Sequence, residues 1–226
     1  MSDTGAAAKV AALATVHAGI AEYYTSKVTR FGATPPGVDW TCVPTQELRF
    51  VQLLKICPSA NPLSINDLGC GYGALLAYLQ RRHPDRQLDY LGIDLSAAMI
   101  RRARGLWRGL AQTRFIIGHA IPRVADFTIA SGIFNVQLDQ SRNDWELFIA
   151  ETCRHMHEGS TLGYAVNFVR TPPAGHPIRQ GLYTTEPALW ANYCAEQFGA
   201  VTEIIDGYGL REFTLLVRRP ASRRGS

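Results

Sequence analysis

Ile65-Asn66-Asp67-Leu68-Gly69-Cys70-Gly71-Tyr72-Gly73 is the stretch that decides the fold, because it joins a short apolar run to a segment of helical character over 73–82. Its three glycines let the backbone turn tightly and approach a ligand without a Cβ in the way. The predicted helix offers free N–H groups at its start. A strand, a glycine turn and a helix in this order are typical of nucleotide-binding sites, although the turn alone does not identify the ligand.

Two carboxylates accompany this turn. Asp67 lies at the end of the first strand, and Asp94 ends the next strand in Leu91-Gly92-Ile93-Asp94. In a doubly wound sheet the carboxyl ends of the strands line the ligand crevice. An acid roughly 20 residues past the glycines can accept both hydroxyls of a ribose, since a carboxylate offers two acceptor oxygens. We therefore predict that Asp94 binds a ribose.

Outside this stretch, short apolar runs alternate with helical segments. The predicted strands are 64–68, 89–93, 114–118, 126–131 and 161–168, and the predicted helices are 73–82, 96–108, 143–157 and 186–198. This alternation predicts crossover units and a parallel sheet buried on both faces. Two last strands, 200–206 and 212–218, are joined by a short glycine-containing link and predict an antiparallel finish. The expected fold class is α/β, with a doubly wound, mostly parallel sheet.

The part before the first strand is predicted to be helical with a break. We expect a loose tail over 1–10 and a helix over 12–29. Prolines and glycines within 30–40 end that helix. A second helix over 45–57 has an apolar stripe at helical spacing, and Pro58 ends it.

The composition is that of one ordinary globular domain, with 226 residues, 46% hydrophobic and 19% charged. The net charge of +4 equals the contribution of four arginines near the end of the chain, so the rest is neutral. A neutral body argues against nucleic acid as a partner. No apolar run approaches the roughly 18 residues that cross a bilayer, and no basic segment typical of a signal peptide precedes the first alanines. We therefore expect a soluble, cytoplasmic protein without membrane contact.

Cysteine usage also bounds the function. The five cysteines are Cys42, Cys57, Cys70, Cys153 and Cys194. Their number is odd and they form no C-x-x-C pair, which argues against a disulfide framework and a zinc site. We predict no metal site and a reducing compartment.

A dinucleotide is one possible ligand of the glycine turn. Gly69-x-Gly71-x-x-Ala74 satisfies the G-x-G-x-x-A form of the dinucleotide fingerprint. Three features favour a different ligand. Asp67 places a negative charge at the turn, which suits an amino or sulfonium cation better than a pyrophosphate. Gly73 departs from the pyrophosphate pattern, and an antiparallel terminal pair is not the dinucleotide topology.

The segments 67–73 and 92–100 together resemble the first two motifs of class I S-adenosylmethionine (SAM)-dependent methyltransferases. The resemblance is close over 65–104 and looser over 64–218. Segments 130–136 and 207–214 are similar to a bacterial branch that methylates small molecules. The resemblance implies a Rossmann-like, seven-stranded sheet with an antiparallel last strand. It also implies SAM as cofactor and S-adenosylhomocysteine (SAH) as product.

The resemblance also implies a cofactor-binding set. In it, the glycines wrap the methionine part of SAM, Asp67 lies near the amino group, Asp94 holds the ribose and Leu95 packs on the adenine. Related enzymes often have an Asp after the third strand for the adenine amino group, whereas this chain has Gly118-His119-Ala120. We therefore expect His119 or the backbone there to contact the adenine. The predicted cofactor-binding residues are Trp40, Arg49, Asp67, Gly69, Cys70, Gly71, Gly73, Asp94, Leu95, His119, Ala120 and Gly132.

Methyl transfer is a direct displacement, so the protein mainly aligns the acceptor and excludes water. A general base is needed only if the acceptor must lose a proton. The predicted catalytic residues are His176 on a loop after the fifth strand, Asn135 after the fourth strand, and Tyr24 in the amino-terminal segment. Structural alternatives remain open: His176 as a solvated loop histidine, Tyr24 as a packing aromatic and Arg49 as a helix-surface residue.

These observations predict an enzyme that transfers a methyl group from SAM to O, N or C of a small-molecule acceptor. The expected organisation is a tail and helical lid over 1–60, a SAM-binding catalytic domain over 61–220 and a disordered basic tail over 221–226. Two other functions stay open, an NAD(P)-dependent oxidoreductase and a catalytically silent SAM-binding scaffold. The oligomeric state is open as well.

Overall fold

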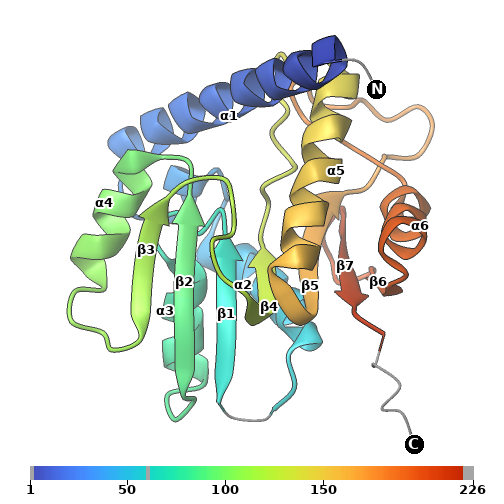
Figure 1. Ribbon diagram of the computed structural model, residues 1–226. Helices are drawn as coiled ribbons and strands as arrows, with labels where there is room; N and C mark the ends of the chain where they lie inside the picture. The colour runs from blue at the N-terminus through green and yellow to red at the C-terminus, as the bar shows by residue number, and fades with distance from the viewer. Residues whose placement is uncertain (1–2, 60–61, 221–226) are drawn as a thin grey trace, which may run out of the picture.

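The computed structural model describes residues 3–59 and 62–220, which form a seven-stranded sheet in the order β3-β2-β1-β4-β5-β7-β6 (Figure 1). The strands are β1 (Leu63–Leu68), β2 (Leu88–Asp94), β3 (Thr113–Ile117), β4 (Ala125–Ala130), β5 (Ser160–Val169), β6 (Val201–Ile205) and β7 (Glu212–Arg218). Strands β1 to β5 pair in parallel, and β7 pairs antiparallel with both β5 and β6. The predicted Rossmann-like α/β fold, with a mostly parallel sheet and an antiparallel terminal pair, is confirmed.

The last strand lies inside the sheet. β7 is inserted between β5 and β6, so β6 forms the exposed edge. The register places Glu212 opposite Val169, at the carboxyl end of β5. The insertion therefore brings an acidic residue from the end of the chain to the same side of the sheet as the glycine turn after β1.

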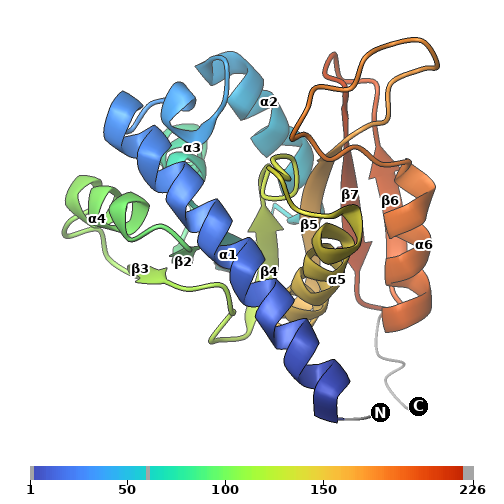
Figure 2. The same ribbon diagram turned by 90° about the horizontal axis from the view of Figure 1, so that it is seen from above.

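Helices cover both faces of the sheet. One face packs on α2 (Val43–Leu53), α3 (Ala74–Arg82) and α4 (Ala97–Leu106), and the other on α5 (Arg142–Glu158) and α6 (Pro187–Phe198) (Figure 2). Leu75 and Ile100 belong to the first core, Trp145 and Trp190 to the second. Burial of these two apolar layers against the central sheet is the main stabilising contribution expected for this architecture.

Helix α1 (Asp3–Phe31) crosses the carboxyl ends of the parallel strands and contacts both α4 and α5 (Figure 1). Its second half is fixed by two polar contacts. Thr25 Oγ1 lies 2.7 Å from Ser96 Oγ at the start of α4, and Lys27 Nζ lies 2.6 Å from Asp39 Oδ1. Although α1 has 29 residues, no helix among the described residues has the length and hydropathy needed to span a membrane.

The expected loose tail over 1–10 is wrong for residues 3–10, which belong to α1. Alanine-rich segments have high helix propensity, and Lys9 adds an ion pair of 2.9 Å to Glu151 on α5. The predicted break is present, with a short 3₁₀ helix η1 (Pro35–Val38), and the second helix ends in a further turn η2 (Leu54–Ile56). Residues 1–2 and the basic tail over 221–226 lie outside the described residues.

Candidate active site

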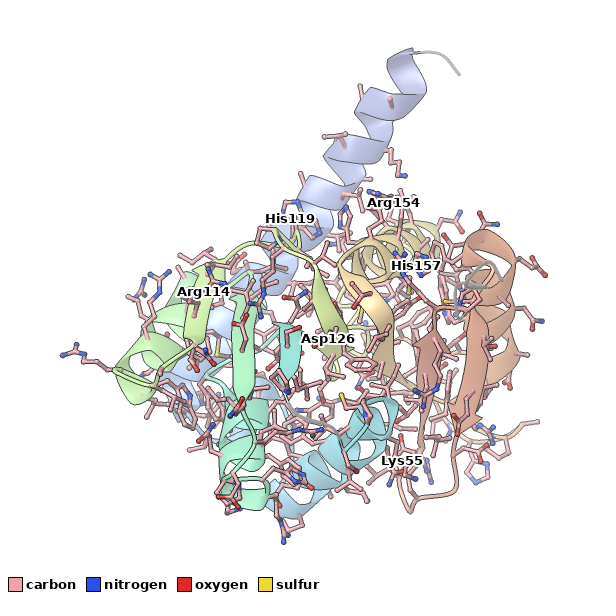
Figure 3. The ribbon with its side chains drawn as sticks, turned by 60° about the horizontal axis from the view of Figure 1, so that its bottom comes forward. Lys55, Arg114, His119, Asp126, Arg154 and His157 are labelled. Carbon is pink, nitrogen blue, oxygen red and sulfur yellow. The ribbon has the colours of Figure 1, made fainter. Side chains whose placement is uncertain are left out.

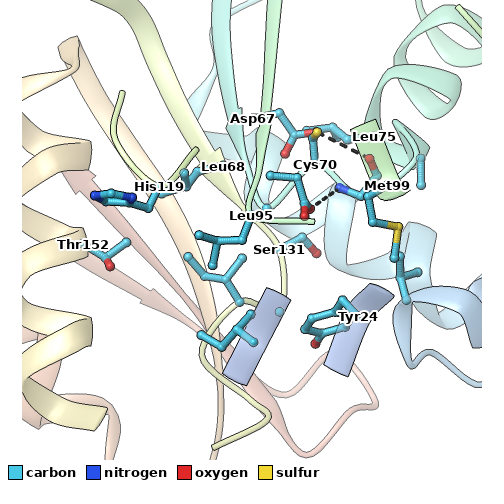
Figure 4. Close-up of a pocket in the computed structure, with 18 of the residues that line it drawn as sticks. Tyr24, Asp67, Leu68, Cys70, Leu75, Leu95, Met99, His119, Ser131 and Thr152 are labelled. Carbon is cyan, nitrogen blue, oxygen red and sulfur yellow. Dashed lines mark hydrogen bonds between the residues drawn. The ribbon is translucent and has the colours of Figure 1, made fainter. Parts of the chain in front are cut away.

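A cavity with an empty volume of about 920 Å³, partly open to solvent, lies beneath α1 at the carboxyl ends of β1, β2 and β4. Figure 4 shows Asp67 and Cys70 on one side and Tyr24 of α1 opposite them. His119 and Thr152 lie toward one end, and Met99 toward the other. A cavity at the carboxyl ends of parallel strands is the usual place of a ligand site in a doubly wound α/β fold.

The glycine turn after β1 forms the part of the wall that the sequence predicts. Gly69 and Gly71 have φ angles of 74° and 55°, in the left-handed region that favours glycine. The N–H groups of Gly69 and Cys70 both donate to the carbonyl of Ile93, at 2.8 and 3.0 Å. These bonds hold the turn against the end of β2, so the backbone of the turn lies beside Asp94.

Asp94 links the glycine turn to the start of α4. Its Oδ2 accepts the N–H of Gly71 at 2.9 Å, and its Oδ1 accepts the N–H of Ser96 at 2.8 Å. Burial raises the pKa of Asp94 to about 6, against the opposing effect of those two hydrogen bonds. Each carboxylate oxygen can accept two hydrogen bonds. Both oxygens therefore keep one acceptor position for a ligand.

Asp67 is a buried carboxyl in the same wall. It is 2% exposed, and Tyr90 donates its hydroxyl to Asp67 Oδ2. Burial raises the pKa of Asp67 to about 7; the Tyr90 hydrogen bond lowers it, and the charge of Asp94 raises it further. A cationic group placed here would gain a counterion, because it stabilises the charged form of a carboxyl that burial disfavours.

His119 lies at the rim of the cavity beside α1 (Figure 3). Its ring stacks on that of His17 of α1, with centroids 4.3 Å apart, and His17 in turn meets Phe148 edge-on. Burial lowers the pKa of His17 to about 4, with smaller contributions from His119 and His155. This ring contact joins α1 to the loop after β3.

The structure brings most of the predicted cofactor residues together. The predicted residues that line the cavity are Tyr24, Trp40, Asp67, Gly69, Cys70, Gly71, Asp94, Leu95, His119 and Gly132. Those outside its lining are Arg49, Gly73, Ala120, Asn135 and His176. Gly73 is the N-cap of α3 just below the turn, and Ala120 is an exposed neighbour of His119.

The burial and contacts of three of these residues explain why they lie outside the cavity lining. Arg49 is buried behind Trp40, with its guanidinium carbon 3.8 Å from the centroid of the indole ring. Asn135 is 5% exposed, and its Oδ1 has no partner among the described residues. His176 is exposed on the loop between β5 and α6, which projects away from α1 (Figure 2). The structure therefore does not bring His176 or Asn135 into the cavity.

Sequence reasoning missed several lining residues. They are Ile20, Val38, Gln46, Phe50, Leu68, Ala74, Leu75, Met99, Gly118, Ser131, Ile133, Phe148 and Thr152. Ser131 carried a usable signal, since it follows β4 directly and precedes the predicted Gly132. Ile20 and Thr152 carried none, because only the packing of α1 and α5 over the sheet brings them to the cavity.

Known proteins share this site and fold. A family model described as "Methyltransferase domain" matches residues 65–159, which include the glycine turn and Asp94. The chain belongs to the class I SAM-dependent methyltransferases, and the cofactor of this family is SAM. The Mycobacterium tuberculosis protein named "Putative methyltransferase Rv1506c" is 39% identical over 166 residues, which cover 74% of this chain and 99% of that protein.

Solved structures share the fold at low sequence identity. Magnesium protoporphyrin IX methyltransferase from Synechocystis, with bound SAH, has a TM-score of 0.57 at 16% identity, covering 78% of this chain and 83% of its own. Human N-acetylserotonin methyltransferase, in complex with SAM, has a TM-score of 0.57 at 13% identity, covering 77% of this chain and 51% of its own. At these identities the likeness concerns the fold alone.

Proposed function

We propose that this chain transfers the methyl group of SAM to a small-molecule acceptor held beneath α1. The observation that carries the proposal is the single cavity that joins the glycine turn, Asp67 and Asp94 to an aromatic compartment around Tyr24 and Trp40. One end supplies groups for a charged nucleoside, and the other supplies apolar surface. A methyltransferase needs both ligands in one enclosed space.

The residues present fit the cofactor. Asp94 keeps acceptor positions for a ribose diol, and Asp67 offers a counterion for the amino group. Ser131 Oγ lines the cavity and is buried without a partner among the described residues. Buried polar atoms are nearly always hydrogen-bonded in native proteins. An unsatisfied hydroxyl at this place is therefore suited to a polar group of a bound ligand.

The chain itself would contribute binding, orientation and water exclusion. When bound, SAM supplies an electrophilic methyl group, which passes to a lone pair of the acceptor while the S–CH₃ electron pair returns to sulfur. Asp94 and the backbone of Gly71 would fix the nucleoside, and Asp67 the amino group. Tyr24 and Trp40 would close the acceptor side against water, which favours a direct displacement between two aligned partners.

We further propose that none of the predicted catalytic residues Tyr24, Asn135 and His176 removes a proton at the acceptor. Burial raises the pKa of Tyr24 well above its ordinary value, so its hydroxyl remains protonated near neutral pH. His119 is stacked on His17 at the rim, and His176 and Asn135 lie outside the lining. Catalysis by alignment suits an acceptor that is nucleophilic without help from the protein.

Size and charge favour a small molecule over a nucleic acid. Helix α1 covers the cavity and is anchored at Ser96 and Asp39. The net charge of +4 depends on the four arginines near the end of the chain, which leaves little basic surface for a phosphate backbone. Neither the NAD(P)-dependent oxidoreductase nor the silent scaffold is favoured, since the buried Asp67 disfavours a pyrophosphate and an intact cofactor site has no use in a scaffold.

Calorimetric titration with SAH tests the cofactor, with NADH titrated in parallel. We expect micromolar binding of SAH, loss of at least about tenfold in affinity for Asp94→Ala, and no binding of NADH. The matched control is Asp85→Ala, because Asp85 is an exposed acid in the turn after α3, outside the cavity lining. Binding of NADH but not SAH would refute the proposal. Transfer of label from methyl-labelled SAM to a pool of small molecules then tests the acceptor class, and transfer only to oligonucleotides or proteins would contradict it.

A further inference from the structure

The acceptor side of the cavity is bounded by Trp40, whose indole lies against the backbone after β4. A Cβ added at Gly132 would come within 2.3 Å of Trp40 Cζ2, so this contact needs glycine at position 132. Gly132 lies at the end of β4, next to Ser131. The indole therefore forms a flat wall beside the part of the cavity that the nucleoside contacts of Asp94 leave free.

Arg49 covers the back of this indole. Its guanidinium carbon lies 3.8 Å from the ring centroid, a close cation–π contact. All three nitrogen atoms of the guanidinium are engaged: Nη1 donates to the Thr45 carbonyl at 2.6 Å, Nε donates to Glu212 Oε2 at 2.8 Å, and Nη2 donates to Glu212 Oε1. Trp40 also lines the cavity, so the part of the indole that Arg49 and Gly132 leave uncovered is available to a ligand.

The contacts of Trp40 close into a circuit. Glu212 Oε2 also accepts Asn167 Nδ2 at 2.6 Å, and Asn167 Oδ1 accepts the N–H of Gly132 at 2.7 Å. The path thus runs from Gly132 through Asn167, Glu212 and Arg49 to Trp40, and back to Gly132. The Asn167, Arg49 and Glu212 side chains are buried. Such a hydrogen-bond network holds Arg49 and Gly132 in place, and therefore also the indole that contacts both of them.

Charge restricts what can bind against this wall. Among the described residues, the cavity lining contains no Lys or Arg, and its charged groups are Asp67 and Asp94. Arg49 is neutralised by Glu212, and Lys27 is paired with Asp39. SAM tolerates this setting because its amino and sulfonium cations outweigh its carboxylate. A second ligand that carries a net negative charge would find no counterion here, and burial of an unpaired charge is costly.

We infer that the acceptor is a flat, largely apolar molecule without a net negative charge that stacks on Trp40, and that Arg49, Glu212 and Asn167 act as positioning residues for this indole. The inference rests on the proposed function and adds the substrate class. According to this inference, the acceptor is recognised by stacking on the indole of Trp40 and not by an ion pair.

The test measures binding to the SAH-saturated protein by calorimetry, so it does not depend on turnover. The probes are 2-naphthol and indole as flat neutral molecules and 6-hydroxy-2-naphthoate as the anionic analogue. We expect a neutral probe to bind at least about tenfold more tightly than the anionic analogue. Equal binding of the anionic analogue, or no binding of both neutral probes, would overturn the inference. Failure of SAH itself to bind would instead overturn the proposed function.

Variants test the wall and its support separately. Trp40→Leu should weaken binding of the neutral probe to the SAH-saturated protein about tenfold, whereas Trp40→Phe should retain most of the binding. Arg49→Lys should weaken binding of the probe about threefold, because an ammonium group can neither make the bidentate contact with Glu212 nor stack as a plane on the indole. The matched control is Arg142→Lys, since Arg142 also stacks on an aromatic ring, that of Tyr183, outside the cavity lining. Unchanged probe binding in Trp40→Leu, with SAH still bound, would refute the role of the indole.

Discussion

Tyr90 donates its phenolic hydrogen to Asp67, and both side chains are almost completely buried, although only Asp67 belongs to the cavity lining. Burial raises the pKa of the Tyr90 hydroxyl well above its ordinary value, so this group stays a donor. The hydrogen bond holds the carboxyl in one orientation but does not offset the effect of burial on its pKa, which remains at about 7. Asp67 therefore changes its charge in the physiological range.

The first prediction concerns stability and pH. The pKa of Asp67 rises from 3.8 to about 7 on folding, so the folded state holds a proton that the unfolded state has lost. Stability should therefore fall as pH rises from about 4 to 7 and stay low above that range. Asp67→Asn should reduce this slope, leaving the smaller contribution of Asp94, and make the protein more stable than the wild type at pH 8 by on the order of 3 kcal/mol. Urea unfolding at pH 5 and pH 8 measures the effect.

Asp85→Asn is the control for that measurement, because Asp85 is exposed and should leave the slope unchanged. An Asp67→Asn protein with the wild-type pH dependence would show that another group is responsible, with Asp94 the first to examine, since its pKa is raised to about 6.

The second prediction concerns cofactor affinity. A cationic amino group stabilises the charged form of Asp67, so ligand binding should lower the pKa of this carboxyl below 7. The affinity for SAH should then decrease as pH falls from about 7.5 to 5.5, by up to about tenfold per pH unit. Titrations of the wild type with SAH across this range measure the pH dependence of the affinity. Asp67→Asn should bind SAH weakly, with an affinity that does not depend on pH. An affinity independent of pH would contradict a contact between Asp67 and the amino group.

The third prediction concerns the contact between His17 and His119. The pKa of His17 falls from 6.5 to about 4 on folding, so the unfolded state binds a proton that the folded state excludes. This contribution to stability is complete above pH 6.5 and is lost as pH falls toward 4. His17→Phe keeps an aromatic ring in the stack and removes the titration. It should stabilise the protein at pH 5 by about 1 kcal/mol, since partial solvent exposure screens the effect, and change little at pH 8.

Thermal unfolding of His17→Phe at both pH values provides this measurement. His83→Phe serves as its control, because His83 is exposed at the end of α3. Equal gains at pH 5 and pH 8 would attribute the effect to packing rather than to protonation.

The fourth prediction concerns the ion pair of Arg49 and Glu212, whose side chains are 8% and 7% exposed. Glu212→Gln leaves a buried guanidinium without a counterion and should destabilise the protein by about 3 kcal/mol. The double variant Arg49→Met with Glu212→Gln should recover part of that loss, since no buried charge remains. Glu203→Gln is the matched control on the neighbouring strand, because Glu203 is exposed. A loss in Glu212→Gln no larger than in this control would contradict the importance of the pair.

The cofactor half of the site could be predicted from sequence because its signals are local. The glycine turn, Asp67 and Asp94 each follow a strand within a few residues, and the strand order of the fold brings them to one edge. Strand and helix segments were recognised for the same reason, since apolar periodicity is a property of short windows.

The acceptor half could not be predicted in this way. From the sequence we predicted Arg49 as a cofactor-binding residue, whereas it lies outside the cavity lining, and its burial depends on Glu212, which is 163 residues away. Likewise, His17 has no local signal that would pair it with His119. His176 was predicted as a base because it lies on a loop after β5. Its surroundings depend on the direction in which that loop leaves the sheet, and no local sequence pattern indicates this direction. The helical start of the chain was missed because an alanine-rich beginning resembles a tail unless a partner such as Glu151 is known.

The separation of Arg49 and Glu212 along the chain has a consequence for biosynthesis. Translation delivers the glycine turn and β2 well before β7. Until residue 212 has been synthesised, Arg49 has no Glu212 carboxylate to pair with and Trp40 has no fixed support behind its ring. Under the proposed function, the nucleoside-binding residues are therefore synthesised before the support of Trp40 is complete.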